Sequence, residues 1–98
     1  MKEFSAVFIA SDNVAMGAKS ALREANLHIP DDISIIGFDD IPWAQYSDPP
    51  LTTIRLPAQK LASEACLLLF DIMKGSEPKE HHLVLDSELV VRQSCRKL

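Results

Sequence analysis

The chain has 98 residues, enough for one small domain. Hydrophobic residues make up 47% and charged residues 24%, a globular composition that argues against intrinsic disorder. The net charge is −4, so this segment lacks the basic surface of a nucleic-acid-binding domain. We interpret the one basic cluster, Arg92, Arg96 and Lys97, as part of a solvated C-terminus.

The cysteines and the apolar runs bear on the cell compartment. Cys66 and Cys95 lack CxxC spacing, and we expect reduced packing residues of an intracellular protein rather than a disulfide. The apolar run FSAVFIA is too short for a signal peptide, and Asp71 interrupts the run LLLFDIM. The sequence therefore predicts a cytoplasmic protein that does not associate with a membrane.

The first part of the chain predicts a strand, a helix and a second strand. Residues 4–10 are apolar enough for a buried strand, and apolar residues recur at helical spacing from Val14. Asn26 suits the end of this helix, and residues 33–38 form a second apolar run. This order predicts a βαβ unit with two parallel strands and a right-handed crossover.

The second part predicts a crossing segment, a long helix and two short strands. Residues 51–56 are extended in pattern, and residues 58–74 carry a wide apolar helical face. Residues 76–80 predict a polar loop, residues 82–86 and 88–93 predict strands, and the tail SCRKL is expected to be loose. The expected fold class is α/β.

Polar residues follow both strands of the predicted βαβ unit. Ser11, Asp12 and Asn13 come after the first strand, and Asp39 and Asp40 come after the second. The carboxyl ends of parallel strands share one edge of the sheet, where ligands bind in open α/β folds. A carboxylate such as Asp39 can accept hydrogen bonds from two hydroxyls of a sugar.

Each of these polar residues also has a purely structural interpretation. Asp39 or Asp40 can cap a following helical turn, and from the residues alone this interpretation stands equal to ligand binding. Ser11 and Asp12 can likewise cap the first helix or face a ligand, with capping favoured for Asp12. Trp43 and Tyr46 are expected at an interface or in the core, ahead of ligand stacking.

We find no catalytic residues and no metal site in the sequence. His81 and His82 point to opposite faces of a strand, and no cysteine lies at ligand spacing from them or from His28. No GxSxG elbow is present, and the glycines are too few for a phosphate loop. The sequence therefore predicts a protein that is not an enzyme and has no cofactor.

Four motifs, in order, carry a resemblance to a known family. They are SDNVAMG, IPDDISIIGFDD, PPLTTIRLP and the closing SELVVRQS. In this order and spacing they resemble the LacI/GalR family of bacterial transcription regulators, from about Ala6 to Ser94. The resemblance implies a partial periplasmic-binding-protein-like (type I) fold, with a parallel βαβ unit, a crossover helix and C-terminal strands.

The resemblance also implies roles for particular residues. In this family a small sugar, nucleobase or similar metabolite binds between two lobes and changes the affinity for operator DNA. It implies that Asp39 contacts the effector, and it adds Ser11, where many members have Asn, and Asp12 as ligand-binding candidates. Met16, Tyr46 and Ser47 are the residues expected at a dimer interface.

The resemblance implies three segments within one effector-binding and dimerisation domain. Residues 1–56 belong to the C-terminal lobe, residues 57–75 form a helix that packs on the other lobe, and residues 76–98 form return strands and the tail. DNA would be bound only through a helix-turn-helix domain absent from this chain. We expect a homodimer or higher self-association. Exchange of the helix 58–74 between copies is one route to it. The alternatives are a fragment of a transporter's sugar-binding protein and a flavodoxin-like enzyme.

Overall fold

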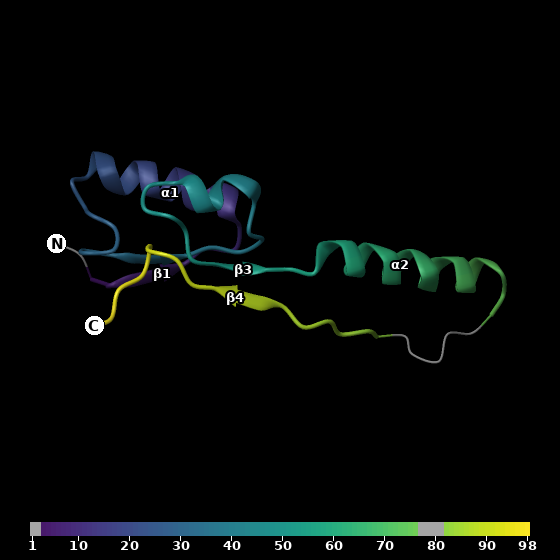
Figure 1. The fold of residues 1–98 in the computed structure, drawn as a ribbon. Coiled ribbons are helices and arrows are strands. Elements are labelled where there is room, and N and C mark those ends of the chain that lie inside the picture. The colour runs from purple at the N-terminus through teal and green to yellow at the C-terminus, as the bar shows by residue number, and fades with distance from the viewer. Residues whose placement is uncertain (1–2, 77–81) are drawn as a thin grey trace. The chain divides into compact units, whose positions relative to one another are not determined.

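A computed structural model describes residues 3–76 and 82–98 of the chain. Its elements, in order, are β1 (Ala6–Phe8), α1 (Asp12–Glu24), β2 (Ser34–Ile36), the 3-10 helix η1 (Pro42–Tyr46), β3 (Thr53–Arg55), α2 (Ala58–Met73) and β4 (Glu88–Val90) (Figure 1). The chain divides into two compact units. Unit 1 is Met1–Arg55 with Glu88–Leu98, and unit 2 is Leu56–Ser87.

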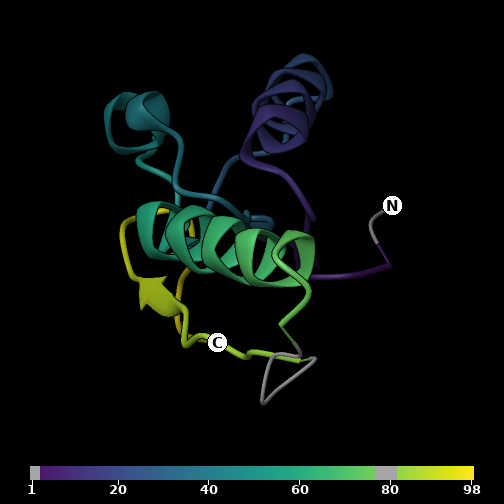
Figure 2. The ribbon, with the colours of Figure 1, turned by 90° about the vertical axis from the view of Figure 1, so that its right-hand side faces the viewer.

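Unit 1 contains the predicted βαβ unit. β1 and β2 pair in parallel, with Val7 opposite Ile35, and α1 connects them. α1 and η1 lie on the same side of the strands (Figure 1, Figure 2). The parallel pair that the sequence predicts is therefore confirmed.

The helix α1 packs on the strands through one face. Asp12, Ala15 and Lys19 are its buried residues, and they recur at the spacing of one helical stripe. Asn26 adopts a positive φ of 61° just past the end of α1, which suits the short polar side chain of an asparagine. Two of the three buried positions are polar, so this face of α1 makes hydrogen bonds as well as apolar contacts.

The chain after η1 runs beside β2. The amide of Gly37 donates to the carbonyl of Thr52 (2.9 Å), and the amide of Asp39 donates to the carbonyl of Ile54 (2.9 Å). β3 then pairs antiparallel with β4, with Ile54 opposite Leu89. The crossing segment is therefore in contact both with the end of β2 and with the returning chain.

The end of the chain is anchored, which corrects the expectation of a loose tail. Ser94 is fully buried; its carbonyl accepts from the amide of Ile35 (2.9 Å), and its hydroxyl accepts from the amide of Thr52 (2.8 Å). Arg96 donates through Nε to the carbonyl of Asp31 (3.0 Å). These partners lie far away in the sequence, so the pattern of the tail itself carries no sign of them.

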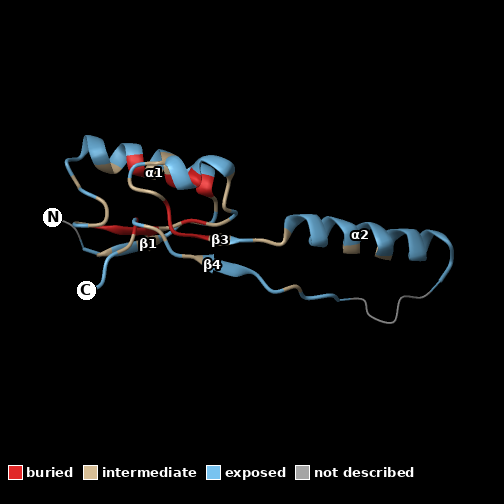
Figure 3. Cartoon of the chain, in the orientation of Figure 1, coloured by how far each residue is buried: buried red, intermediate tan, exposed pale blue. Residues whose placement is uncertain are grey.

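The core of unit 1 is small and lies between α1, η1 and the strands (Figure 3). Its fully buried apolar residues are Ala15, Ile33, Ile35, Ala44 and Leu51. The partly buried residues packed against them are Val7, Ile9, Met16, Leu22, Leu27, Ile29 and Ile41.

Unit 2 contains α2, which corresponds to the helix predicted at residues 58–74. No residue of α2 is buried, although the structure describes the whole helix (Figure 3). Its exposed large apolar residues, each between 46% and 72% exposed, are Leu61, Leu67, Leu69, Phe70, Ile72 and Met73. The wide apolar face predicted from the sequence is therefore present and uncovered in this chain.

The strand expected at residues 82–86 does not form. This segment has no regular structure, and the only strand of the described residues after α2 is β4, which begins at Glu88. A strand needs a hydrogen-bonded neighbour, and β4 has one in β3. The loop expected at residues 76–80 and His81 fall mostly outside the described residues.

Replacing Gly37 by alanine tests the close packing at the end of β2. A Cβ at this position would collide with the Asp12 carboxylate and would lie 2.9 Å from Leu51 Cδ2. We expect G37A to lower the free energy of unfolding by about 1–3 kcal/mol, measured by urea denaturation.

G17A is the matched control, because a Cβ at Gly17 would meet nothing within 4 Å. In the interior of α1 this change should raise stability by about 0.5–1 kcal/mol. A G37A protein as stable as the unmodified chain would contradict the packing described for this edge.

Candidate functional site

The start of α1 and the segment after β2 lie side by side at one edge of the sheet. The amide of Asp12 donates to the carbonyl of Phe38 (3.0 Å), and the amide of Ile9 donates to the carbonyl of Ile36 (2.8 Å). The two polar clusters of the sequence therefore meet where the parallel pairing places them. This edge is the candidate functional site.

Asp12 lies inside the protein at this edge. It is fully buried, with Oδ1 accepting from Thr53 Oγ1 (2.7 Å) and Oδ2 accepting from the amide of Ile41 (3.0 Å). The N-cap residue of α1 is Ser11, and α1 has no side-chain cap hydrogen bond, so the capping role favoured for Asp12 is wrong. Asp12 instead connects α1 to the loop after β2 and to β3. Its contact with a ligand stays a prediction.

Ser11 has an extended backbone, with φ −151° and ψ 136°, and a partly buried side chain. Its carbonyl accepts from the amide of Ala15 (2.9 Å), but its hydroxyl makes no capping bond to α1. The capping interpretation of the Ser11 hydroxyl is therefore wrong. A hydroxyl is both a donor and an acceptor, so Ser11 adds both functions to the edge.

Asp39 and Asp40 both have left-handed backbones. Their φ values are 124° and 58°, and neither is a glycine. Such conformations cost about 1–3 kcal/mol each and persist only where the surrounding structure holds them in place. Asp39 is exposed, so the turn presents its carboxylate to solvent at the edge.

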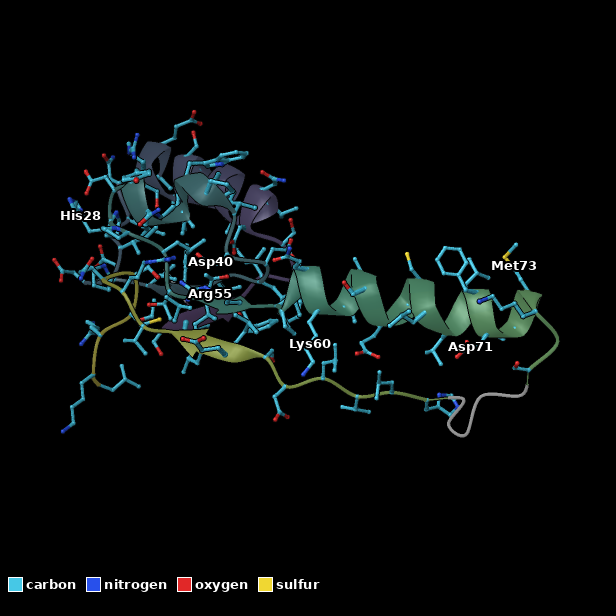
Figure 4. The ribbon with its side chains drawn as sticks, turned by 45° about the vertical axis from the view of Figure 1, so that its right-hand side comes forward. His28, Asp40, Arg55, Lys60, Asp71 and Met73 are labelled. Carbon is cyan, nitrogen blue, oxygen red and sulfur yellow. The ribbon has the colours of Figure 1, made fainter. Side chains whose placement is uncertain are left out.

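Asp40 is held by two arginines, Arg55, which lies next to it in Figure 4, and Arg92. Its Oδ2 lies 2.8 Å from Arg55 Nε and its Oδ1 lies 2.8 Å from Arg92 Nη2, while its side chain is only 10% exposed. The expected capping role is wrong for both acids, since the N-cap of η1 is Ile41 and no side chain caps it. The expectation of a solvated Arg92 is also wrong, because it is part of this ion-paired cluster.

The charge state of Asp40 follows from these contacts. Burial by itself raises the pKa of its carboxyl, but the hydrogen bonds and positive charges of Arg55 and Arg92 outweigh burial. The pKa of Asp40 is therefore held below its ordinary value of 3.8. Asp40 is ionised across the physiological range.

Sequence reasoning missed Thr53, Arg55 and Arg92, which hold the acids of the edge. Thr53 and Arg55 are two residues apart on β3. Thr53 donates to the buried Asp12, and Arg55 donates to Asp40. Arg92 also donates through Nη1 to the carbonyl of Leu51 (2.9 Å). The two-residue spacing in LTTIR was the available signal, because alternate residues of a strand share a face.

The residues expected at a dimer interface have different environments. Tyr46 and Trp43 are 80% and 54% exposed on η1, so their core interpretation is wrong. Met16 is partly buried against the core. The hydroxyl of Ser47 accepts from Lys19 Nζ (2.9 Å) and donates to the carbonyl of Ala44 (2.8 Å).

A pocket of about 300 Å³ lies on the C-terminal half of α1 and contains none of the predicted ligand residues. Its lining residues are Lys19, Arg23, Asn26, Leu27, His28, Ile29, Asp48 and Pro49. Burial lowers the pKa of Lys19, which also donates to the carbonyl of Pro49.

Within residues 3–76 and 82–98, no group of acids, histidines or cysteines could hold a metal ion. None of the described helices is long and apolar enough to cross a membrane.

The pH dependence of stability tests the Asp40 cluster. Because the pKa of Asp40 is lower in the folded protein than its ordinary 3.8, the carboxylate stabilises the fold above that pH and loses this effect as the pH falls further. We expect D40N to lower the free energy of unfolding by about 1–3 kcal/mol at neutral pH. The difference from the unmodified chain should shrink below pH 3.8. A difference that is constant with pH would contradict the clamp.

Comparison with known proteins agrees with this architecture. A family model described as a periplasmic binding protein-like domain matches residues 2–95. The HTH-type transcriptional repressor CytR of Escherichia coli (strain K12) is 46% identical over 94 residues. That alignment covers 96% of this chain and 28% of the relative. The chain therefore spans less than a third of the length of such relatives.

Two solved structures are similar in fold and sequence. The transcription regulator CcpA of Lactococcus lactis superposes with a TM-score of 0.88 at 31% identity, covering 96% of this chain and 35% of that one. A LacI family transcriptional regulator from Enterococcus faecium, with bound ribose, gives 0.86 at 34% identity, covering 99% and 36%. All three proteins are transcription regulators by name, which favours the regulator over the transporter component. The chain belongs to the family of periplasmic binding protein-like domains, and it matches part of the effector-binding domain of LacI-family transcription regulators.

Proposed function

We propose that this chain is the ligand-sensing and dimerisation portion of a LacI-family transcription regulator, with a small sugar-like effector bound at the edge of Asp39 and Ser11. The observation that carries this function is the exposed carboxylate of Asp39, presented by a left-handed turn at the carboxyl end of β2. The ribose bound to a matched regulator supports a sugar as the ligand class.

The chemistry of the edge fits polyhydroxyl compounds. The two oxygens of Asp39 can accept from neighbouring hydroxyls in charge-assisted hydrogen bonds. The Ser11 hydroxyl can donate to or accept from a third group. Asp12 supports both from inside, because its buried carboxylate fixes the start of α1 against the loop after β2.

The effector would act on DNA binding elsewhere in the regulator. The net charge of −4 gives this segment no attraction for a phosphate backbone, so operator binding would belong to a helix-turn-helix domain outside these 98 residues. Such a regulator works in the cytoplasm, where its operator lies. The proposal includes no catalytic step.

Replacing Asp39 tests the ligand contact. We expect D39N to weaken ribose binding by about 10-fold to 100-fold, since a hydrogen bond to a charged group contributes about 1.5–3 kcal/mol. Titration calorimetry on the full chain measures this change. Other pentoses, hexoses and disaccharides extend the panel and identify the ring that fits best.

D31N is the matched control, because it removes the same charge from an exposed aspartate. The bond from Arg96 to this residue goes to its backbone carbonyl, which the substitution keeps. Its affinity should stay within about twofold of the unmodified chain, because isolated surface charges have small effects. Equal losses in D31N and D39N would contradict a direct contact. Failure of every sugar to bind would contradict a sugar site formed by Asp39 and Ser11 within these 98 residues.

Self-association is the second part of the proposed function. Of the three residues expected at a dimer interface, Tyr46 has the most exposed side chain, at 80%. Tyrosine and tryptophan are enriched at protein interfaces, and Trp43 is exposed on the same 3-10 helix. Ser47, in contrast, is already bonded to Lys19 and to the carbonyl of Ala44, so it supports the segment that carries Tyr46.

Replacing Tyr46 tests this interface. We expect Y46A to raise the dimer dissociation constant by about 10-fold or more, as for an aromatic interface anchor, measured by sedimentation equilibrium. Q45A, in the same turn, is the control, because Gln45 is exposed and its side chain donates a hydrogen bond within η1, to the carbonyl of Pro42 (3.4 Å). Similar dissociation constants for Y46A and Q45A would contradict this role of Tyr46.

A further inference from the structure

Three consecutive residues at the candidate site are fixed in three different ways. The amide of Asp39 donates to the carbonyl of Ile54 (2.9 Å), and the amide of Ile41 donates to Asp12 Oδ2 (3.0 Å). Between them, Asp40 is fixed through its side chain by Arg55 and Arg92. Every residue of this turn therefore has a bond to another element of unit 1.

The backbone of this turn does not hold itself. Asp39 and Asp40 have φ values of 124° and 58°, a region that residues other than glycine rarely adopt. Two such residues in succession persist only where the surrounding structure restrains them. If either backbone relaxed, the exposed carboxylate of Asp39 would change its direction. Asp39 itself is held by the bond from its amide to Ile54, and the next restraint along the chain is the carboxylate of Asp40.

The ion pairs of Asp40 are strong enough to act as this restraint. The carboxylate is 10% exposed and Arg92 is 14% exposed, and both distances are 2.8 Å. Shielding from water strengthens the pair with Arg92 in particular, since Arg55 is itself 49% exposed. The two oxygens of the carboxylate each pair with a separate guanidinium. The neighbouring pair between Arg55 and Glu88 is longer, at 3.8 Å, and lies in solvent with side chains 49% and 68% exposed.

We propose that Asp40 is a positioning residue, which holds the strained turn through Arg55 and Arg92 so that Asp39 stands ready for the ligand. This inference rests on the proposed contact between Asp39 and an effector. Asp40 offers a ligand little surface, because its side chain is 10% exposed and each of its carboxylate oxygens is paired with an arginine. The two adjacent acids thus have separate roles, one anchoring the turn and one meeting the effector.

The experiment compares D40N with E88Q. Both changes remove one negative charge and one partner of Arg55, but only D40N releases the turn. The first measurement needs no ligand: it is hydrogen exchange of the Asp39 and Ile41 amides in the full chain. We expect D40N to lower the protection of the Asp39 amide by about 10-fold, the effect of losing about 1.4 kcal/mol of local restraint. E88Q should change it by less than about twofold, because exposed ion pairs have small effects.

The second measurement is ribose affinity by calorimetry. We expect D40N to weaken it by about 10-fold and E88Q by less than about twofold, in parallel with the exchange data. R55Q is the reserve variant if D40N fails to fold, as judged by circular dichroism. R55Q removes one of the two cations and should give a smaller loss of Asp39 protection in the same direction.

The outcomes separate this inference from the proposed function. Unchanged Asp39 protection in folded D40N, or in R55Q where D40N is unfolded, overturns the positioning role whatever binds. Loosening by E88Q equal to that by D40N overturns it as well, because a general charge effect would then suffice. If the unmodified chain binds no sugar while D40N still loosens Asp39, the restraint of the turn is supported and the sugar-binding function fails.

Discussion

The buried carboxylate of Asp12 is the interaction on which the rest of unit 1 depends. A fully buried polar side chain is tolerated only when its polar atoms are hydrogen-bonded, and Asp12 has a partner on each oxygen. Thr53 comes from the crossing strand β3, and the amide of Ile41 comes from the loop after β2. Since Asp12 is also the first residue of α1, one side chain fixes three segments to one another. Removing it would leave the buried hydroxyl of Thr53 and the partly buried amide of Ile41 without this acceptor.

A second carboxylate extends this arrangement to the surface. Asp40 joins the same loop to Arg55 of β3 and to Arg92, which follows β4. Arg92 is tied in turn to Leu51 and to Thr52, whose hydroxyl accepts from its amide (2.9 Å). Within the described residues, no buried side-chain polar atom lacks a hydrogen-bond partner. The polar side chains of this edge are thus restrained by contacts within the chain, and such preorganisation generally reduces the entropy that a site loses on binding.

Local patterns in the sequence predicted the helices and strands of this edge but not the hydrogen bonds and ion pairs that join them. Apolar runs and helical spacing located β1, α1, β2 and α2, because these signals depend on neighbouring residues. The partners of Asp12 and Asp40 lie 41 and 52 residues away, at Thr53 and Arg92. For the same reason a short polar tail was expected to be loose, although Ser94 is fully buried. Apart from the two-residue spacing of Thr53 and Arg55, these contacts between distant segments have no local signal in the sequence, so the fold was needed to find them.

The two arginines that pair with Asp40 lie on the two segments through which the chain leaves and re-enters unit 1. Arg55 is the last residue of unit 1 before the chain enters unit 2, and Glu88 is the first residue after it returns. Arg92 follows four positions later, so Asp40 is anchored on both segments that carry the chain out of and back into unit 1. The turn that presents Asp39 therefore shares its supports with the two crossings. Loss of the Asp40 carboxylate would remove an ion-pair partner from Arg55 and from Arg92, one residue on each of the two segments that join the units.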